Sequence, residues 1–231
     1  MNPDELAFGF LEYVVFLLST TCHEAAHSLV AKMGGDTTAL EGGQVSLNPL
    51  PHIKREPFGM VIIPLIGIAT GTGLIGWASA PYNAAWAQEH PKKAARMSLA
   101  GPAANFGLAI LAGILMRIGL AMGSFVPVPA SFSQIVAPAQ AGGIGEGIAT
   151  VLSIFFSLNI LLGFFNLIPF PPLDGFGVLG LFTTEAGALR LQNLRMKMGA
   201  FAFVGLVVAW RVFDRFFPAL FAFGLNLFRF S

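Results

Sequence analysis

The chain has 231 residues, of which 55% are hydrophobic and only 11% are charged, and its formal net charge is +1. Soluble domains carry about 25% charged residues, so this chain lacks the polar surface of a soluble globule. A net charge so close to zero also gives no electrostatic basis for binding nucleic acid. Several apolar runs reach or exceed the roughly 20 residues that cross a bilayer, which predicts an integral membrane protein with several spans.

The first apolar segment runs from about Leu6 to Ala31 and is followed by a stretch rich in glycine and proline, residues 32–57. Within that stretch, "QVSLNP" predicts a short strand. Residues 58–80 are apolar but are interrupted by a proline and several glycines. They could cross the membrane once, or enter it and return where protein buries the backbone. A small β or re-entrant element is therefore expected after the first helix.

Two cleaner spans follow, from Ser98 to about Gly123 and from about Ile148 to Ile168, and a last hydrophobic segment covers about 199–225. These lengths suit membrane helices. The sequence thus predicts an all-α polytopic membrane protein that forms a single domain over residues 1–231. The segment at 199–225 is expected to be an accessory element.

The distribution of lysine and arginine predicts the orientation in the membrane, because cytoplasmic loops are enriched in these residues. The linker between the Ser98 and Ile148 spans has neither residue and is expected outside. The basic residues expected on the cytoplasmic side are Lys54, Arg55, Lys92, Lys93, Arg96, Arg190, Arg195 and Lys197. Residues 32–57 and the loop before Ser98 can share that side only if residues 58–80 return.

The sequence "HEAAH" at residues 23–27 lies near the end of the first apolar segment. His23 and His27 are four residues apart, so on a helix they project from one face and can hold one metal ion. Glu24 lies about 100° further round, where it could take a proton from an attacking water. Ionisable groups inside a span indicate function, although the motif could also lie at the membrane interface.

A catalytic zinc usually has three protein ligands and one open position. His52, His90 or a carboxylate could be the third ligand. Asp174 is the favoured carboxylate, because "NLIPFPPLDG" follows a span directly and its prolines exclude a continuous helix. The alternative is that Asp174 caps a helix beginning near Phe176.

Two asparagines are candidates for binding the scissile carbonyl or its oxyanion. Asn166 lies eight residues before Asp174, and Asn105 lies in "AGPAANF" at the head of a span. A buried amide can donate to a developing oxyanion. It can equally make the interhelical hydrogen bonds that are usual for asparagine in membranes.

"HEAAH", "SLAGPAANF" and "NLIPFPPLDG", in this order, resemble the site-2 protease family of intramembrane zinc metalloproteases. The resemblance implies one Zn²⁺ per chain, with His23, His27 and Asp174 as ligands and Glu24 as general base. It implies a three-helix catalytic core within about residues 6–184. It also implies hydrolysis of peptide bonds in or near transmembrane segments of membrane-protein substrates, the chemistry of regulated intramembrane proteolysis.

The similarity is to compact bacterial members without PDZ or CBS domains, which implies a bacterial cytoplasmic membrane and a site nearer its cytoplasmic side. "GWASAPYN" resembles their tryptophan segment, but Ser79 stands where they usually have lysine. A catalytically silent relative that serves as a binding module, or a metal transporter, are the alternative functions. The sequence predicts neither the physiological substrate nor an oligomeric state.

Overall fold

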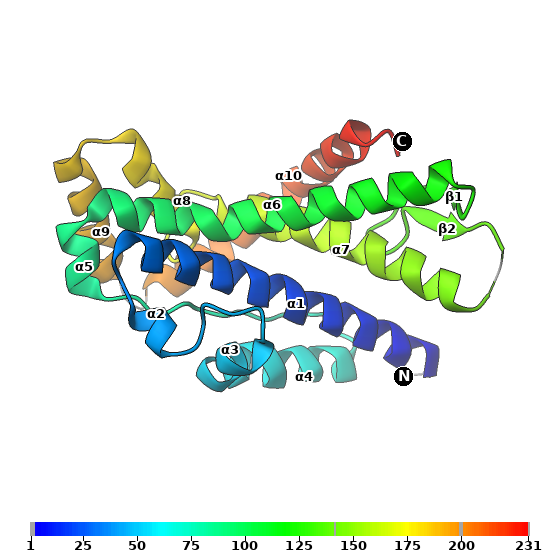
Figure 1. The fold of residues 1–231 in the computed structure, drawn as a ribbon, viewed down its shortest axis with the longest axis horizontal. Coiled ribbons are helices and arrows are strands. Elements are labelled where there is room, and N and C mark those ends of the chain that lie inside the picture. The colour runs from blue at the N-terminus through cyan, green and yellow to red at the C-terminus, as the bar shows by residue number, and fades with distance from the viewer. Residues whose placement is uncertain (1–2, 141, 199–200, 231) are drawn as a thin grey trace.

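The computed structural model describes residues 3–140, 142–198 and 201–230. Three long helices dominate it: α1 (Pro3–Gly34), α6 (Pro91–Ala121) and α7 (Ile144–Asn166). They lie side by side, with α1 and α7 running in one direction and α6 in the opposite one (Figure 1). The end of α1 and the beginning of α6 therefore lie at one end of the molecule, which is on the left in the figure, and α7 runs toward that end.

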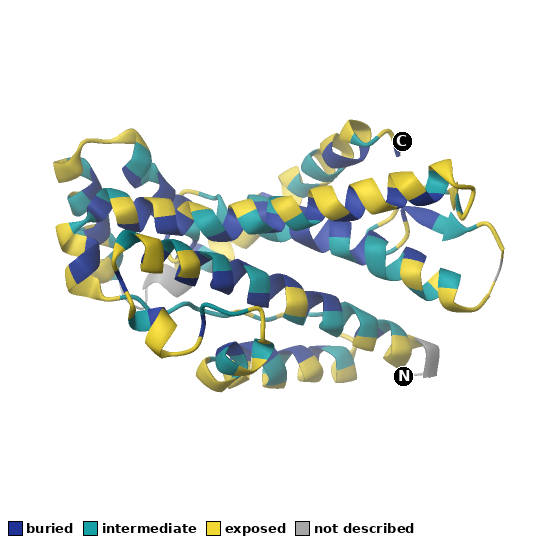
Figure 2. Ribbon diagram, viewed as in Figure 1, coloured by how far each residue is buried: buried dark blue, intermediate teal, exposed yellow. Residues whose placement is uncertain are grey.

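The three helices are long and apolar enough to cross a membrane, over Glu5–Gly34, Pro91–Ala121 and Ile144–Asn166. Their inward faces are buried against one another, whereas their outward faces are exposed (Figure 2). The outward residues are themselves apolar, as Ile110, Leu111 and Ile114 on α6 illustrate. An apolar surface of this extent suits lipid rather than water. The prediction of an all-α polytopic membrane protein is confirmed.

After α1 the chain forms α2 (Thr38–Glu41), α3 (Pro49–Arg55), the π-helical turn η1 (Phe58–Ile62) and α4 (Ile63–Thr70). The strand predicted at "QVSLNP" is wrong, since these residues form bends and the beginning of α3. The Asn48 side chain accepts a hydrogen bond from the backbone N–H of Leu50, and Pro49 occupies the first helical position. A capped helix start of this kind outweighs the short apolar alternation that suggested a strand.

Beyond α4 the chain turns at Gly71, which has a positive φ of 69°, and runs back in extended form along η1 and α4. The backbone N–H of Trp77 donates to the carbonyl of Gly59 at 3.1 Å. A Cβ atom at Gly59 would lie 2.3 Å from the Trp77 carbonyl oxygen, so only glycine permits this approach. Residues 58–83 therefore form a hairpin, and the backbone N–H of Asn83 at its end donates to Asp36, just beyond α1.

Ser79 lies on the returning arm of this hairpin. Its hydroxyl donates to Glu56 and accepts from Nε of Arg55 at 3.2 Å. The arginine of α3 thus places a positive charge beside Ser79. The serine thus ties the returning arm of the hairpin to Arg55 and Glu56, which lie just before it.

The remaining elements lie at the two ends of the bundle. The strands β1 (Phe125–Pro127) and β2 (Val136–Pro138) pair antiparallel between α6 and α7, with Val126 opposite Ala137. The helices at the other end are α5 (Ala84–Glu89), α8 (Asp174–Val178), η2 (Leu179–Phe182) and α9 (Glu185–Met198). The last helix, α10 (Phe201–Leu227), packs against α7. The first two residues of the accessory segment predicted at 199–225 lie outside the described part of the chain.

Candidate metal centre

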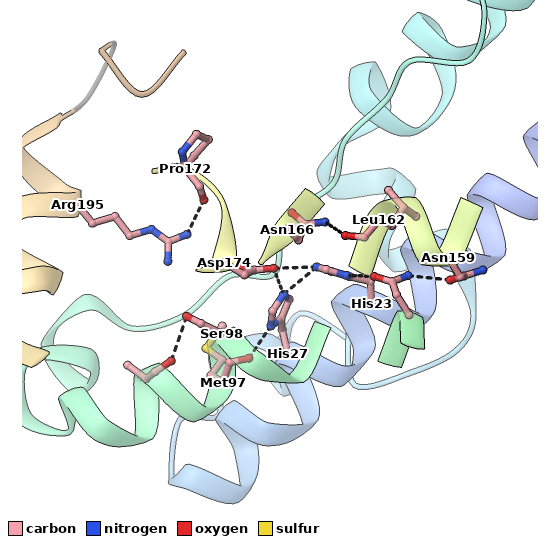
Figure 3. A network of polar contacts seen from close by, with 12 residues as sticks. His23, His27, Met97, Ser98, Asn159, Leu162, Asn166, Pro172, Asp174 and Arg195 are labelled. Atoms are coloured by element: carbon pink, nitrogen blue, oxygen red, sulfur yellow. Dashed lines mark hydrogen bonds and ion pairs between the residues drawn. The ribbon is translucent and has the colours of Figure 1, made fainter. Parts of the chain in front are cut away.

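Three side chains from distant parts of the sequence converge between the long helices. His23 Nε2 and His27 Nε2 lie 3.0 Å apart, and each lies 3.1 Å from Oδ2 of Asp174 (Figure 3). Both imidazoles are buried, at 6% and 5% exposure. Asp174 is 151 residues from His23, and it is brought there by the segment that follows α7. Within the described residues, this is the one group of three histidine, cysteine or carboxylate side chains arranged to hold a metal ion.

The outer nitrogens of the two imidazoles show which atoms face the centre. His27 Nδ1 lies 2.7 Å from the backbone carbonyl of Met97, which can only accept a hydrogen bond. His23 Nδ1 lies 2.6 Å from Oδ1 of Asn105. When both Nδ1 atoms donate, both neutral Nε2 atoms present lone pairs to the centre.

Two imidazole lone pairs and a carboxylate oxygen repel one another at about 3 Å unless a positive charge lies between them. Two histidines and one carboxylate also form a donor set that catalytic zinc prefers. The residues fit a zinc ion.

Asp174 is held by a short non-helical segment. The chain leaves α7 after Asn166, passes through Pro171 and Pro172, and enters α8 with Asp174 as its first residue. The guanidinium of Arg195 on α9 donates to the carbonyl of Pro172 at 3.1 Å (Figure 3). The alternative expectation, a helix-capping role, does not describe this side chain, since Leu173 occupies the N-cap position of α8.

Gly101 on α6 faces the imidazoles of His23 and His27. A Cβ atom at this position would lie 2.4 Å from Nε2 of His23 and 2.4 Å from Nε2 of His27. The backbone of α6 therefore passes close to both Nε2 atoms, and a side chain there would collide with them. The sequence contained a signal for this role, because Met97, Gly101 and Asn105 are spaced four residues apart and share one helix face.

Glu24 lies next to His23 on α1 and is 5% exposed. Among the described residues its carboxylate makes no side-chain hydrogen bond, although it lies near enough to His27 to interact with it electrostatically. Glu24 is thus a buried carboxylate that accepts no hydrogen bond from a described side chain. It lies beside the group formed by His23, His27 and Asp174.

The two candidate asparagines differ in their surroundings. Both polar atoms of Asn105 are engaged, since Oδ1 contacts His23 and Nδ2 donates to Asn159 at 2.8 Å. Its amide therefore supports a histidine and is fully buried. Asn166, at the end of α7, donates to the carbonyl of Leu162 at 3.0 Å and is partly exposed, so it retains capacity for another partner.

The alternative histidine ligands lie elsewhere. His52 is buried in α3, where its Nε2 donates to the carbonyl of Ser46 at 3.0 Å. His90 lies between α5 and α6, and its ring contacts that of Trp86 edge to face. Neither belongs to the group formed with Asp174.

Comparison with known proteins agrees with this arrangement. Residues 11–209 match the family described as peptidase family M50. Over 167 residues, the chain is 33% identical to "Putative zinc metalloprotease YwhC" of Bacillus subtilis, covering 72% of this chain and 66% of that protein. It is 32% identical to "Putative zinc metalloprotease Rip2" of Mycolicibacterium smegmatis, covering 71% of this chain and 54% of that protein. The alignments thus span about two thirds and about half of these relatives. No solved structure matches the chain.

The family match extends from within α1 to within α10 and includes all three converging side chains. The matched region begins before His23 and ends 35 residues after Asp174. The resemblance to the site-2 proteases inferred from the motifs is confirmed, and the chain belongs to peptidase family M50.

Proposed function

We propose that the protein is a zinc-dependent endopeptidase that hydrolyses peptide bonds in or near transmembrane segments of other membrane proteins. One observation carries the proposal: Nε2 of His23, Nε2 of His27 and Oδ2 of Asp174 converge to within 3.1 Å between helices that are apolar enough to span a membrane. The names of the two curated relatives support the choice of zinc and of peptide hydrolysis.

In this proposal His23, His27 and Asp174 hold one Zn²⁺ per chain. The ion, when bound, supplies a Lewis acid that lowers the pKa of water and polarises a peptide carbonyl. Glu24 takes the proton from the attacking water and returns it to the leaving amine. Its burial and its lack of a donor among the described residues support this role, since the carboxylate is not neutralised by an internal partner.

Asn166 is the candidate for binding the scissile carbonyl. It is partly exposed, it lies at the end of α7, and one N–H of its amide is not needed by the bond to Leu162. A donor there would stabilise negative charge on the carbonyl oxygen. Asn105 is the weaker candidate, because its amide nitrogen already donates to Asn159 and the residue is fully buried.

The position of the centre supports this substrate class. His23 and His27 lie within the apolar stretch of α1, so a substrate must present its peptide bond at the depth of a membrane helix. Peptide groups in a helix are hydrogen-bonded internally and must be freed before water can attack. We infer that the substrate segment unwinds locally next to the centre.

We further propose that the chain acts in a bacterial cytoplasmic membrane with the centre nearer the cytoplasm. The centre lies toward the end of the bundle at which α1 and α7 finish and α6 begins (Figure 1). The basic residues predicted to face the cytoplasm belong to α3, α6 and α9 or adjoin them at that end. We assign the catalytic core to residues 6–184 of a single domain, with α10 as an accessory helix.

The test is purification in detergent, metal analysis and cleavage of a model transmembrane substrate by wild type and Glu24→Gln. We expect about one zinc per chain in both proteins, and a rate about 10²–10⁴-fold lower in Glu24→Gln, the usual contribution of a general base. Glu12→Gln is the matched control, because Glu12 lies about 18 Å before Glu24 along α1. Equal rates for wild type and Glu24→Gln would refute the mechanism. Loss of the wild-type rate on chelation, and its return with zinc, would establish metal dependence.

A further inference from the structure

A closed chain of polar side chains connects the three long helices beside the candidate zinc ligands. Ser19 and His23 lie one turn apart on α1, Asn105 lies on α6, and Asn159 lies on α7. Asn159 Nδ2 is 2.9 Å from Ser19 Oγ, Asn105 Nδ2 is 2.8 Å from Asn159 Oδ1, and Asn105 Oδ1 is 2.6 Å from His23 Nδ1. Ser19, Asn105 and Asn159 are fully buried. Figure 3 shows the part of this chain that runs from Asn159 to His23.

The backbone carbonyl of Phe155 fixes the direction of every hydrogen bond in this series of side chains. Asn159 Nδ2 also lies 2.8 Å from the backbone carbonyl of Phe155, which can only accept. The amide nitrogen of Asn159 must therefore face Phe155 and Ser19, and its oxygen must face Asn105. Asn105 must then donate to Asn159 and turn its own oxygen toward His23. That oxygen requires a proton on Nδ1 of His23.

The consequence concerns the metal-binding atom. A neutral imidazole carries one proton, so a proton held at Nδ1 leaves Nε2 bare and able to bind a cation. If the Asn105 amide were reversed, its N–H would face Nδ1, the proton would move to Nε2, and the ligand atom would be blocked. The carbonyl of Phe155 thus acts on the ligand atom of His23 through two side-chain amides.

We propose that Asn159 is a positioning residue that fixes the orientation of Asn105 and, through it, the metal-binding tautomer of His23. This inference rests on the proposed function, since it takes His23 as a zinc ligand. Partners of ligating histidines hold the ring and its tautomer, and their loss typically weakens metal affinity by about 10–100-fold. Asn159 does not touch His23 and acts on it through Asn105. It belongs to α7, a helix that carries none of the three ligands.

Two substitutions separate orientation from packing. Asn159→Leu has a similar size but cannot direct the Asn105 amide. Asn159→Asp keeps an acceptor toward Asn105 whether it is ionised or protonated, because the protonated acid can still donate to Phe155. A purely structural role predicts that the aspartate, a potential charge at a fully buried position, is the more harmful change. The proposed role predicts the opposite order for zinc affinity.

The experiment measures zinc affinity of the full-length protein in detergent by competition with a chromophoric chelator. We expect Asn159→Leu to bind zinc at least about 10-fold more weakly than wild type, and Asn159→Asp to bind within a few-fold of wild type. Ser157→Ala is the control on the same helix, since the Ser157 hydroxyl is buried without a partner among the described residues. Its zinc affinity should equal that of wild type.

Unchanged affinity in Asn159→Leu, or equal weakening in Asn159→Asp and Asn159→Leu, would overturn the proposal. These measurements do not require proteolysis. A protein that binds zinc as expected but cleaves nothing would refute the proposed function and leave the role of Asn159 intact.

Discussion

Gly101 approaches His27 so closely that a Cβ atom on the glycine would lie 2.4 Å from Nε2 of the imidazole, and the same distance separates it from Nε2 of His23. We predict that Gly101→Ala largely abolishes zinc binding and activity, because a methyl group there displaces the ring nitrogens from the centre. Metal content of the purified variant, measured by mass spectrometry, checks this directly.

The control for that substitution is Gly107→Ala on the same helix. A Cβ atom at Gly107 meets nothing within 4 Å, so this change adds a methyl group without a clash. Replacing glycine by alanine in a helix stabilises it by up to about 1 kcal/mol, and Gly107→Ala should keep wild-type zinc content with equal or higher thermal stability. Stoichiometric zinc in Gly101→Ala would contradict the close approach of α6.

The ligand group could be anticipated from the sequence because its geometry is mostly local. The spacing of His23 and His27 places them on one helix face, and the prolines before Asp174 exclude a helix that would carry the carboxylate away. The structure brings His23, His27 and Asp174 together. Their role as zinc ligands, drawn from "HEAAH" and "NLIPFPPLDG", stays a prediction. The three long helices were predictable for a similar reason, since continuous apolar length is a strong signal.

What could not be predicted depends on contacts between segments. The strands lie between α6 and α7, where three-residue segments rich in proline give almost no pattern, whereas "QVSLNP" became the capped beginning of α3. The partners of Asn105 likewise depend on the packing of α7 against α6. A polar residue in a membrane span predicts that a hydrogen bond forms, but it does not predict the partner.

Arg195 should influence the centre although it touches no ligand. Its guanidinium holds the carbonyl of Pro172, two residues before Asp174. A hydrogen bond typically contributes about 0.5–1.5 kcal/mol net, and this one is exposed to water, so Arg195→Gln should weaken zinc affinity by a few-fold at most. Arg190→Gln, on the exposed face of the same helix, is the control and should match wild type in the same chelator competition. Equal affinity in both variants would show that the loop is held without Arg195.

Asp36 joins the end of α1 to the end of the hairpin. Its carboxylate accepts from the backbone N–H and hydroxyl of Thr38 at 3.0 and 2.6 Å, and from the backbone N–H of Asn83 at 2.8 Å. Burial raises its pKa, but these hydrogen bonds outweigh burial and lower the pKa below the ordinary value of 3.8. We predict that Asp36→Ala lowers the free energy of unfolding by about 1–3 kcal/mol.

The pH dependence of that effect has a defined sign. A carboxyl whose folded pKa is depressed contributes its full stabilisation above the unfolded pKa and loses it as pH falls through the folded pKa. The difference in melting temperature between wild type and Asp36→Ala should therefore be constant from pH 7 to about 5, and should shrink below the unfolded value of 3.8. Thermal unfolding in detergent across this range measures it. A difference that grows on acidification would contradict the hydrogen bonds to the ionised form.

The hairpin of residues 58–83 determines how many times the chain crosses the membrane. If it returns, Lys54 before it and Glu89 after it face the same side, and Ser131 between α6 and α7 faces the other. If it crosses, Lys54 and Glu89 face opposite sides. All three residues are exposed, so each can be replaced by cysteine in a Cys22→Ala background and labelled with a membrane-impermeant maleimide.

We predict that Ser131→Cys is labelled in intact cells, whereas Lys54→Cys and Glu89→Cys are labelled only after permeabilisation. The reason is physical: the backbone of Trp77 is hydrogen-bonded to Gly59, so the returning arm satisfies part of its backbone inside the protein and need not continue across the lipid. The basic residues near Lys54 and Glu89 favour the cytoplasm for both. Labelling of Lys54→Cys and Glu89→Cys from opposite sides would exclude the return. If Lys54→Cys and Glu89→Cys were both labelled in intact cells and Ser131→Cys were protected, the hairpin would still return to the side from which it enters. The protein would then have the opposite orientation in the membrane.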